Sequence, residues 1–223
     1  MMRLRLSKPI LWLALLASVL TSGCATNTRQ YDYAAFKESR PKSILILPPI
    51  NNSPDIKASY SMLSTMTFPV AESGYYVLPV TLVDQAFKEN GLQNPVEMHG
   101  APATKLREIF GADAALYVTI EKFGALYAVI ISQVVVAAKA TLIDLRSGKI
   151  LWSGQASASS SEEQSNSGGG LIGLLITAVV QQIVNNVSDN SHHIADIANQ
   201  RLLTAGHHNG LLYGPRSAKY GTD

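Results

Sequence analysis

Residues 114–159 carry the feature that most restricts the fold. In AALYVTIEKF (114–123) the aliphatic Leu116, Val118 and Ile120 alternate with Tyr117, Thr119 and Glu121, which is the spacing of a strand with one buried face. A long run rich in β-branched residues follows, and RSGK, in which Gly148 can adopt positive φ, then reverses the chain before KILWSGQASAS. We therefore predict an antiparallel meander of three strands.

The preceding segment has a different rhythm, in which strands and helices alternate. We expect a buried strand at 44–47, a helix over about 55–73 interrupted by Pro69, and a second strand in YYVLPV (75–80). A short helix then places Leu82, Val83, Ala86 and Phe87 on one face, and after a loop at 92–102 another helix is closed by Gly111. The sequence thus predicts an α+β fold (an α/β sandwich), with an N-terminal β-α-β unit, the C-terminal meander and flanking helices on a mixed sheet.

The first residues indicate export. Arg3, Arg5 and Lys8 precede an apolar stretch of 12 residues, 9–20, which is too short to span a bilayer and typical of a signal-peptide core. TSGC follows, and it resembles the cleavage site of a bacterial lipoprotein signal, although Thr21 stands where Leu is usual. The resemblance implies cleavage between Gly23 and Cys24, with diacylglycerol and palmitate-type acyl chains on Cys24. Ala25, rather than Asp, implies sorting to the outer membrane.

Cys24 is the only cysteine of the chain, so a lipid on its sulfur leaves no thiol for a disulfide, a metal site or catalysis. Removing the signal takes the 18 basic residues to 15 against 16 acidic ones, so the mature chain has a net charge of −1. A chain without basic excess is a poor partner for nucleic acid. No later apolar run is long enough to cross a membrane.

We expect four parts along the chain. Residues 1–23 form the cleaved signal, 24–41 a lipidated flexible tether, and 207–223 a C-terminal tail. Between them, 42–206 form a single α/β domain with a Ser/Gly-rich loop at 157–170 and a final helical stretch, SHHIADIANQRLL (191–203).

Catalytic and cofactor motifs are weak. Gly168, Gly170 and Gly173 spell GxGxxG, but a polar loop precedes them where a dinucleotide site needs a strand. His192, His193, His207 and His208 are close in sequence but lack the HExxH spacing, and no GxSxG is present. Asp113 and Asp144 stand at element ends, where turn capping is the ordinary role. We therefore assign no catalytic residue, metal or cofactor.

The glycine run leads into LIGLLITAVV (171–180), which is too short to span a bilayer. The run continues as an amphipathic helix to Ser188. Either its first turn is buried in its own domain, or it docks on a partner or on the membrane surface. In the second case Leu171, Ile172, Leu174 and Leu175 are the candidate interface.

Several phrases together resemble a family of bacterial lipoproteins of unknown function: ILILPPINNSPD, ESGYYVLPV, FGADAALYVTI, LIDLRSGKILWSG and LLYGPR. Such proteins are similar to the curli-secretion lipoprotein CsgG and to the amino-terminal domain of TolB. The resemblance implies a non-enzymatic accessory or assembly module of an envelope export or surface-assembly complex.

The implied location is the outer membrane, with a lipid anchor and most of the chain in the periplasm or at the cell surface. Its partners would be other envelope lipoproteins, CsgG-like ones among them, or copies of itself. Two alternatives remain open: a periplasmic hydrolase or metal-dependent enzyme that uses the His-rich C-terminal region, and a small-ligand carrier.

Overall fold

A mixed β-sheet is the centre of this computed structural model, which describes residues 31–127, 132–162 and 187–223. Among them, the sheet takes β1 (Ser43–Ile46), β2 (Ile50–Asn51), β3 (Tyr76–Val77), β4 (Ala114–Tyr127), β5 (Ser132–Asp144) and β6 (Ile150–Ser159). The strand order is β3-β1-β4-β5-β6, and β2 also pairs with β4.

Strand directions differ between the two halves of the sheet. Strand β1 runs parallel to β3 and β4, whereas β4–β5 and β5–β6 are antiparallel. The β5–β6 turn contains Gly148 at φ 71°, as RSGK predicts. The mixed sheet, its N-terminal β-α-β unit and its meander are therefore confirmed.

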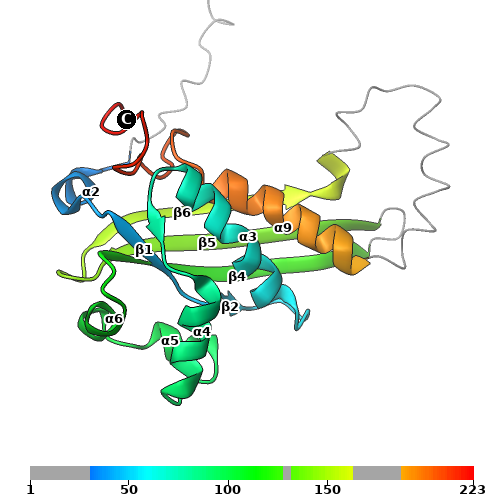
Figure 1. Ribbon diagram of the computed structural model, residues 1–223. Helices are drawn as coiled ribbons and strands as arrows, with labels where there is room; N and C mark the ends of the chain where they lie inside the picture. The colour runs from blue at the N-terminus through cyan, green and yellow to red at the C-terminus, as the bar shows by residue number, and fades with distance from the viewer. Residues whose placement is uncertain (1–30, 128–131, 163–186) are drawn as a thin grey trace, which may run out of the picture. The chain divides into compact units, whose positions relative to one another are not determined.

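Two long helices lie side by side on one face of the sheet (Figure 1): α3 (Ala58–Glu72) and α9 (Val187–Leu203). Alanines on α9 permit close packing, and Ile194, Ala195 and Ala198 are all at most 1% exposed. Helix α3 contributes Met62 and Met66, which are fully buried. Pro69 lies in the last turn of α3, so the helix continues through it rather than stopping there.

Three shorter helices flank the other face: α4 (Val80–Glu89), α5 (Pro95–His99) and α6 (Ala103–Phe110). Alternation along β1 divides its side chains between the two faces. Leu45 and Leu47 join the cluster under the short helices, and Ile44 and Ile46 therefore point to the α3 and α9 side. The buried members of the cluster are Leu45, Leu47, Val83, Phe87, Met98, Leu106, Ala112, Ala115 and Leu145.

The folded unit starts at Asp32 rather than at Lys42, and its C-terminal segment packs against it. Helix α2 (Ala34–Ser39) occupies part of the segment that the sequence assigns to the tether, because Phe36 supplies one buried apolar anchor and is 3% exposed. At the other end, the amide of Gly214 donates to the carbonyl of Ser73 at 2.8 Å. A Cβ at Gly214 would lie 2.5 Å from the carbonyl oxygen of Gly74, so this approach requires glycine.

Two further differences concern local structure. The expected loop at 92–102 contains α5, whose N-cap Asn94 accepts a hydrogen bond from the Glu97 amide at 3.0 Å. The expected helix from Leu171 lies outside the described residues, apart from its end at 187–188, which belongs to α9. None of the helices that the structure describes is both long and apolar enough to cross a membrane.

Candidate functional site

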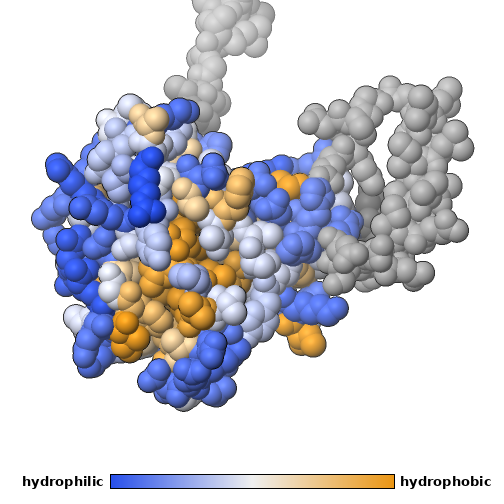
Figure 2. All heavy atoms as spheres, in the orientation of Figure 1, coloured by the Kyte–Doolittle hydropathy of each residue, from blue (hydrophilic) through white to orange (hydrophobic). Residues whose placement is uncertain are grey.

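An apolar groove lies between α4 and α6. It consists of two cavities of about 500 Å³ and about 490 Å³, which share Ala86, Ile109 and Phe110 as lining residues. Figure 2 shows a continuous hydrophobic surface in this part of the molecule, framed by hydrophilic residues. Each volume falls in the range of about 300–1,000 Å³ that is usual for binding sites.

The groove exists because the two helices are short. Helix α4 has 10 residues and α6 has 8, so at 1.5 Å per residue they are roughly 15 Å and 12 Å long. Each begins directly after a proline, Pro79 or Pro102. Gly91 follows α4 and Gly111 caps α6, and both adopt positive φ. Helices bounded in this way cannot extend over the space between them.

The apolar face predicted for α4 carries more large side chains than the core buries. Val83 and Phe87 are buried as predicted, whereas Leu82 is 61% exposed and lines the groove. Ile109 on α6 is 58% exposed on the groove's other side. The rings of Phe87 and Phe110, 5.3 Å apart between centroids, join the two helices.

The charges around the groove are largely paired. On the surface of α6, Lys105 forms an ion pair with Glu108 at 2.7 Å, and Arg107 lies 3.5 Å from Asp113. Residues 80–113 carry five acidic and three basic side chains in total, a formal charge of −2. Among the residues that line the two cavities, the charged ones are Glu97 and Lys105, one of each sign, so the groove is an apolar strip without a net charge in its lining.

One wall of the groove is fixed to α3. Lys88 on α4 donates to Asp84 and to the hydroxyl of Tyr60, both at 2.7 Å. These hydrogen bonds raise the pKa of Lys88, so the ammonium stays charged across the physiological range. Helix α4 thus holds one position relative to α3.

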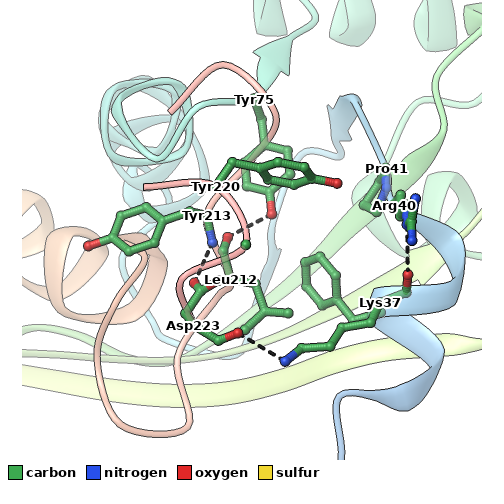
Figure 3. A pocket seen from close by; sticks show the side chains of 10 residues that line it. Lys37, Arg40, Pro41, Tyr75, Leu212, Tyr213, Tyr220 and Asp223 are labelled. Carbon is green, nitrogen blue, oxygen red and sulfur yellow. Dashed lines mark hydrogen bonds between the residues drawn. The ribbon is translucent and has the colours of Figure 1, made fainter. Parts of the chain in front are cut away.

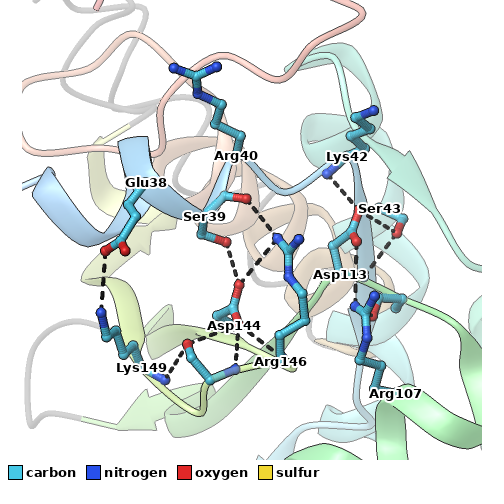
Figure 4. A network of polar contacts seen from close by, with 12 residues as sticks. Glu38, Ser39, Arg40, Lys42, Ser43, Arg107, Asp113, Asp144, Arg146 and Lys149 are labelled. Carbon is cyan, nitrogen blue, oxygen red and sulfur yellow. Dashed lines mark hydrogen bonds and ion pairs between the residues drawn. The ribbon is translucent and has the colours of Figure 1, made fainter.

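A polar network joins α2 to the β5–β6 turn (Figure 4). Asp144 accepts hydrogen bonds from the amides of Arg146 and Ser147 at 2.8 and 2.7 Å, which confirms its predicted turn-capping role. Its other oxygen accepts from the hydroxyl of Ser39 on α2, and Arg146 donates to the Ser39 carbonyl at 2.7 Å. Burial would raise the pKa of Asp144, but the hydrogen bonds from Ser39, Ser147 and Arg146 prevail and lower it.

Asp113 has a similar role at the start of β4 and β1. It accepts from the amide of Lys42 at 3.0 Å and from the Ser43 hydroxyl at 3.3 Å. Burial would raise the pKa of Asp113, but hydrogen bonds from Lys42 and Ser43 outweigh it and lower the pKa. Both aspartates therefore hold the N-terminal segment on the sheet, and neither borders the groove.

The structure does not describe the site residues that the sequence predicts. Gly23 and Cys24, and the candidate interface of Leu171, Ile172, Leu174 and Leu175, lie outside the described residues. The groove itself was not predicted. A sequence signal for it is the apolar face of 81–91, on which Val83 and Phe87 are buried and Leu82 is left exposed.

The C-terminal histidines divide between two elements. His192 and His193 lie on α9, and His207 and His208 follow it in a turn. Nδ1 of His192 lies 2.9 Å from the Ser61 hydroxyl, on the exposed surfaces of α9 and α3. Ser61 is inside a helix, where backbone amides bond within the helix and do not form an oxyanion hole. Within the described ranges, no three His, Cys, Asp or Glu side chains are grouped so as to hold a metal ion.

Comparison with known proteins gives a family. The family model "Putative lipoprotein GNA1162-like" matches residues 31–216. The chain is 44% identical over 210 residues to "Putative lipoprotein NMB1124/NMB1162" of Neisseria meningitidis serogroup B (strain ATCC BAA-335 / MC58), which covers 94% of this chain and 96% of that protein. It is also similar to the crystal structure of lipoprotein GNA1162 from Neisseria meningitidis, with 46% identity, a TM-score of 0.52, and coverage of 65% of this chain and 99% of the other. The family match spans most of the chain, and the relative is similar over almost its whole length, so the chain belongs to the GNA1162-like family of lipoproteins.

Proposed function

We propose that this protein is a lipid-anchored, non-enzymatic accessory or assembly module of an envelope export or surface-assembly complex at the outer membrane. Membership of a lipoprotein family supports the anchor, with Cys24 as the lipidated residue. The observation that carries the proposal is the exposed apolar groove between α4 and α6, which requires a partner to cover it.

The chemistry of the groove favours a protein segment as its occupant. Its charged lining residues, Glu97 and Lys105, are of opposite sign, so the groove presents no cationic patch to anionic lipid headgroups or to nucleic acid. Paired charges around an apolar centre are the usual composition of a protein interface. The partner would therefore present a row of apolar side chains, from a helix or an extended segment, to Leu82 and Ile109.

The anchor limits where this partner is found. Seven residues lie between Cys24 and Asp32, and the eight Cα–Cα steps of a fully extended chain across them reach roughly 26–29 Å. The groove would thus work close to the membrane surface, where the partner is another envelope protein. The predicted similarity to CsgG makes a CsgG-like lipoprotein the first partner to examine.

A pull-down with the full lipidated chain from solubilised envelopes tests the proposal. The wild type should recover a stoichiometric envelope protein, and a Leu82→Ser, Ile109→Ser double variant should lose at least nine tenths of it. The matched control is Ile56→Ser, Phe68→Ser, which removes two large apolar residues that are 89% and 64% exposed outside the groove. Recovery should be unchanged in the control.

Two results would count against the groove. Equal recovery by both double variants would place the contact elsewhere, and wild-type chain recovered alone would leave it without a partner. Capture of only a second, differently tagged copy of this chain would show that the groove serves self-association instead. Thermal unfolding of each variant separates these outcomes from loss of the fold.

The non-enzymatic part of the proposal has its own test. His192, His193, His207 and His208 are replaced together by Gln in the full chain. We expect unchanged metal content and an unchanged phenotype. Loss of a bound metal, or of function in the cell with the fold intact, would establish the histidine-dependent enzyme as the better reading.

A further inference from the structure

A second cavity, which shares no lining residue with the groove, opens between α2 and the C-terminal segment. Its volume is about 450 Å³, which is within the range of small-molecule sites. The apolar part of its lining comes from Phe36 and Pro41 near α2, and from Leu212 on the C-terminal segment. None of these residues lines the groove between α4 and α6.

The C-terminal wall of this cavity is held in one conformation. The buried hydroxyl of Tyr75 donates to the carbonyl of Leu212 at 2.7 Å, and burial raises the pKa of Tyr75, so the donor stays protonated. The amide of Arg216 donates to Gly74 at 3.0 Å, beside the close contact of Gly74 with Gly214. The cavity is therefore formed by fixed backbone from two distant parts of the sequence.

Two cations line the opposite side. Lys37 donates to the main-chain oxygen of Asp223 at 2.9 Å, and the side-chain carboxylate of Asp223, which is the acid among the lining residues, accepts from the amide of Tyr213 at 2.6 Å. Arg40 donates from Nε to the Lys37 carbonyl at 3.3 Å and forms no ion pair with any residue that the structure describes. Figure 3 shows the hydroxyl of Tyr220 pointing toward the side on which Arg40 and Pro41 lie.

The backbone of Arg40 gives an independent indication. Arg40 caps α2 in the left-handed conformation, at φ 47°, a position where glycine is usual. Among the described residues other than glycine, Asn209 alone shares positive φ, and asparagine tolerates it well. An arginine in this conformation is less stable than glycine would be, and backbone outliers of this kind cluster at active sites and ligand-binding sites.

We propose that this cavity binds a small organic anion, with a carboxylate or phosphate on Arg40 and a ring or short apolar body against Phe36 and Leu212. The guanidinium is a planar fork that matches either anion in a bidentate geometry. Tyr220 supplies a hydroxyl donor to the same group, and its ring adds an aromatic wall. Arg216 and Lys219 stack on Tyr76 and Tyr213 at 5.3 and 5.5 Å, which adds positive potential near the entrance.

Saturation-transfer NMR and calorimetry on the full chain test this site with four probes. Benzoate and phenyl phosphate carry both the ring and the anion, benzyl alcohol carries only the ring, and inorganic phosphate carries only the anion. We expect benzoate or phenyl phosphate to bind at least tenfold more tightly than benzyl alcohol and inorganic phosphate. The stronger of the two identifies the anionic group. Equal binding of all four, or none at all, overturns the proposal.

Variants locate the binding. Arg40→Gly should abolish it while the melting temperature stays equal or rises, because glycine relieves the left-handed strain. Arg216→Gln removes a nearby positive charge outside the lining, and it should change affinity by less than threefold. A tenfold loss in Arg216→Gln, or unchanged binding in Arg40→Gly, would show that Arg40 is not the anion site. Because Arg40 does not line the groove, the Arg40→Gly result is independent of the partner pull-down.

Discussion

The two faces of the sheet are covered to different degrees. On one face α3 and α9, with 15 and 17 residues, pack against each other and bury Met62, Met66 and Ile194 completely. On the other face α4 and α6 are bounded by proline and glycine, and large apolar residues such as Leu82 and Ile109 remain more than half exposed. The longer pair closes its face of the sheet, whereas the shorter pair leaves large apolar side chains uncovered.

The largest difference between the faces should appear in matched isoleucine variants. Ile194→Ala on α9 should lower the free energy of unfolding by about 2–5 kcal/mol, because Ile194 is 0% exposed and its removal leaves a cavity. Ile109→Ala in the groove should change it by less than about 0.5 kcal/mol, since the side chain is already in water and alanine favours helix. Urea unfolding of both variants measures the difference, and equal losses would mean that the groove is part of the core.

A polar residue tests the same difference between the two faces, with a smaller expected loss of stability. Asn199 on α9 is fully buried and donates to the Met62 carbonyl at 2.9 Å and to the Thr65 hydroxyl at 2.7 Å. Asn199→Ala should cost about 1–3 kcal/mol, because it removes both bonds from a closed interface.

The neighbouring Gln200 supplies the control. It bonds only to the exposed Asp196, and Gln200→Ala should stay within about 0.5 kcal/mol in the same urea titration. A negligible loss in Asn199→Ala would show that the α3–α9 contact is wetter than its burial indicates.

The smallest predicted effect concerns the α2 attachment, where polar groups rather than apolar ones close the surface. Asp144 has a lowered pKa in the folded protein, so its stabilisation is complete above the unfolded value of about 3.9 and is lost as the pH falls through the folded value. Asp144→Asn should cost about 0.5–1.5 kcal/mol at pH 7, because Asn keeps the turn acceptor but not the charge. It should also flatten the loss of stability below pH 4.

Chemical unfolding between pH 7 and pH 2 measures this dependence. Glu121→Gln is the control, because Glu121 forms an exposed ion pair with Lys139 at 3.4 Å that contributes little. A pH profile of Asp144→Asn that coincides with the wild type would show that the Ser39–Asp144 contact does not stabilise α2.

Local sequence signals identify most of the fold. Alternation in 114–123 and the RSGK turn predict the meander, and the glycine at 111 ends α6 in the left-handed conformation as expected. Asp144 was assigned to turn capping from its position alone, and its hydrogen bonds to the following amides have that geometry. These features depend on neighbours within a few residues, which is why the sequence reveals them.

Features that depend on contacts between residues far apart in the sequence are not predicted from the sequence. Helix α2 was placed in the tether, because one buried phenylalanine among polar residues gives no periodic signal. The C-terminal segment was expected to be a tail, although Leu211 and Leu212 are buried on contacts with residues more than a hundred positions away. The candidate sites share this property, since the groove and the cavity beside Arg40 are each lined from separate elements.

Hydrophobic periodicity, turn residues and family resemblance are all encoded along the chain, so the mixed sheet, the order of its main elements and membership of a lipoprotein family are predictable from it. Which apolar side chains stay uncovered depends instead on tertiary packing. Leu82 and Val83 are adjacent and chemically alike, and only the position of the sheet beneath α4 places one in water and the other in the core. Exposure is a property of packing between elements, and packing at the α4–α6 face leaves Leu82 and Ile109 uncovered in the groove.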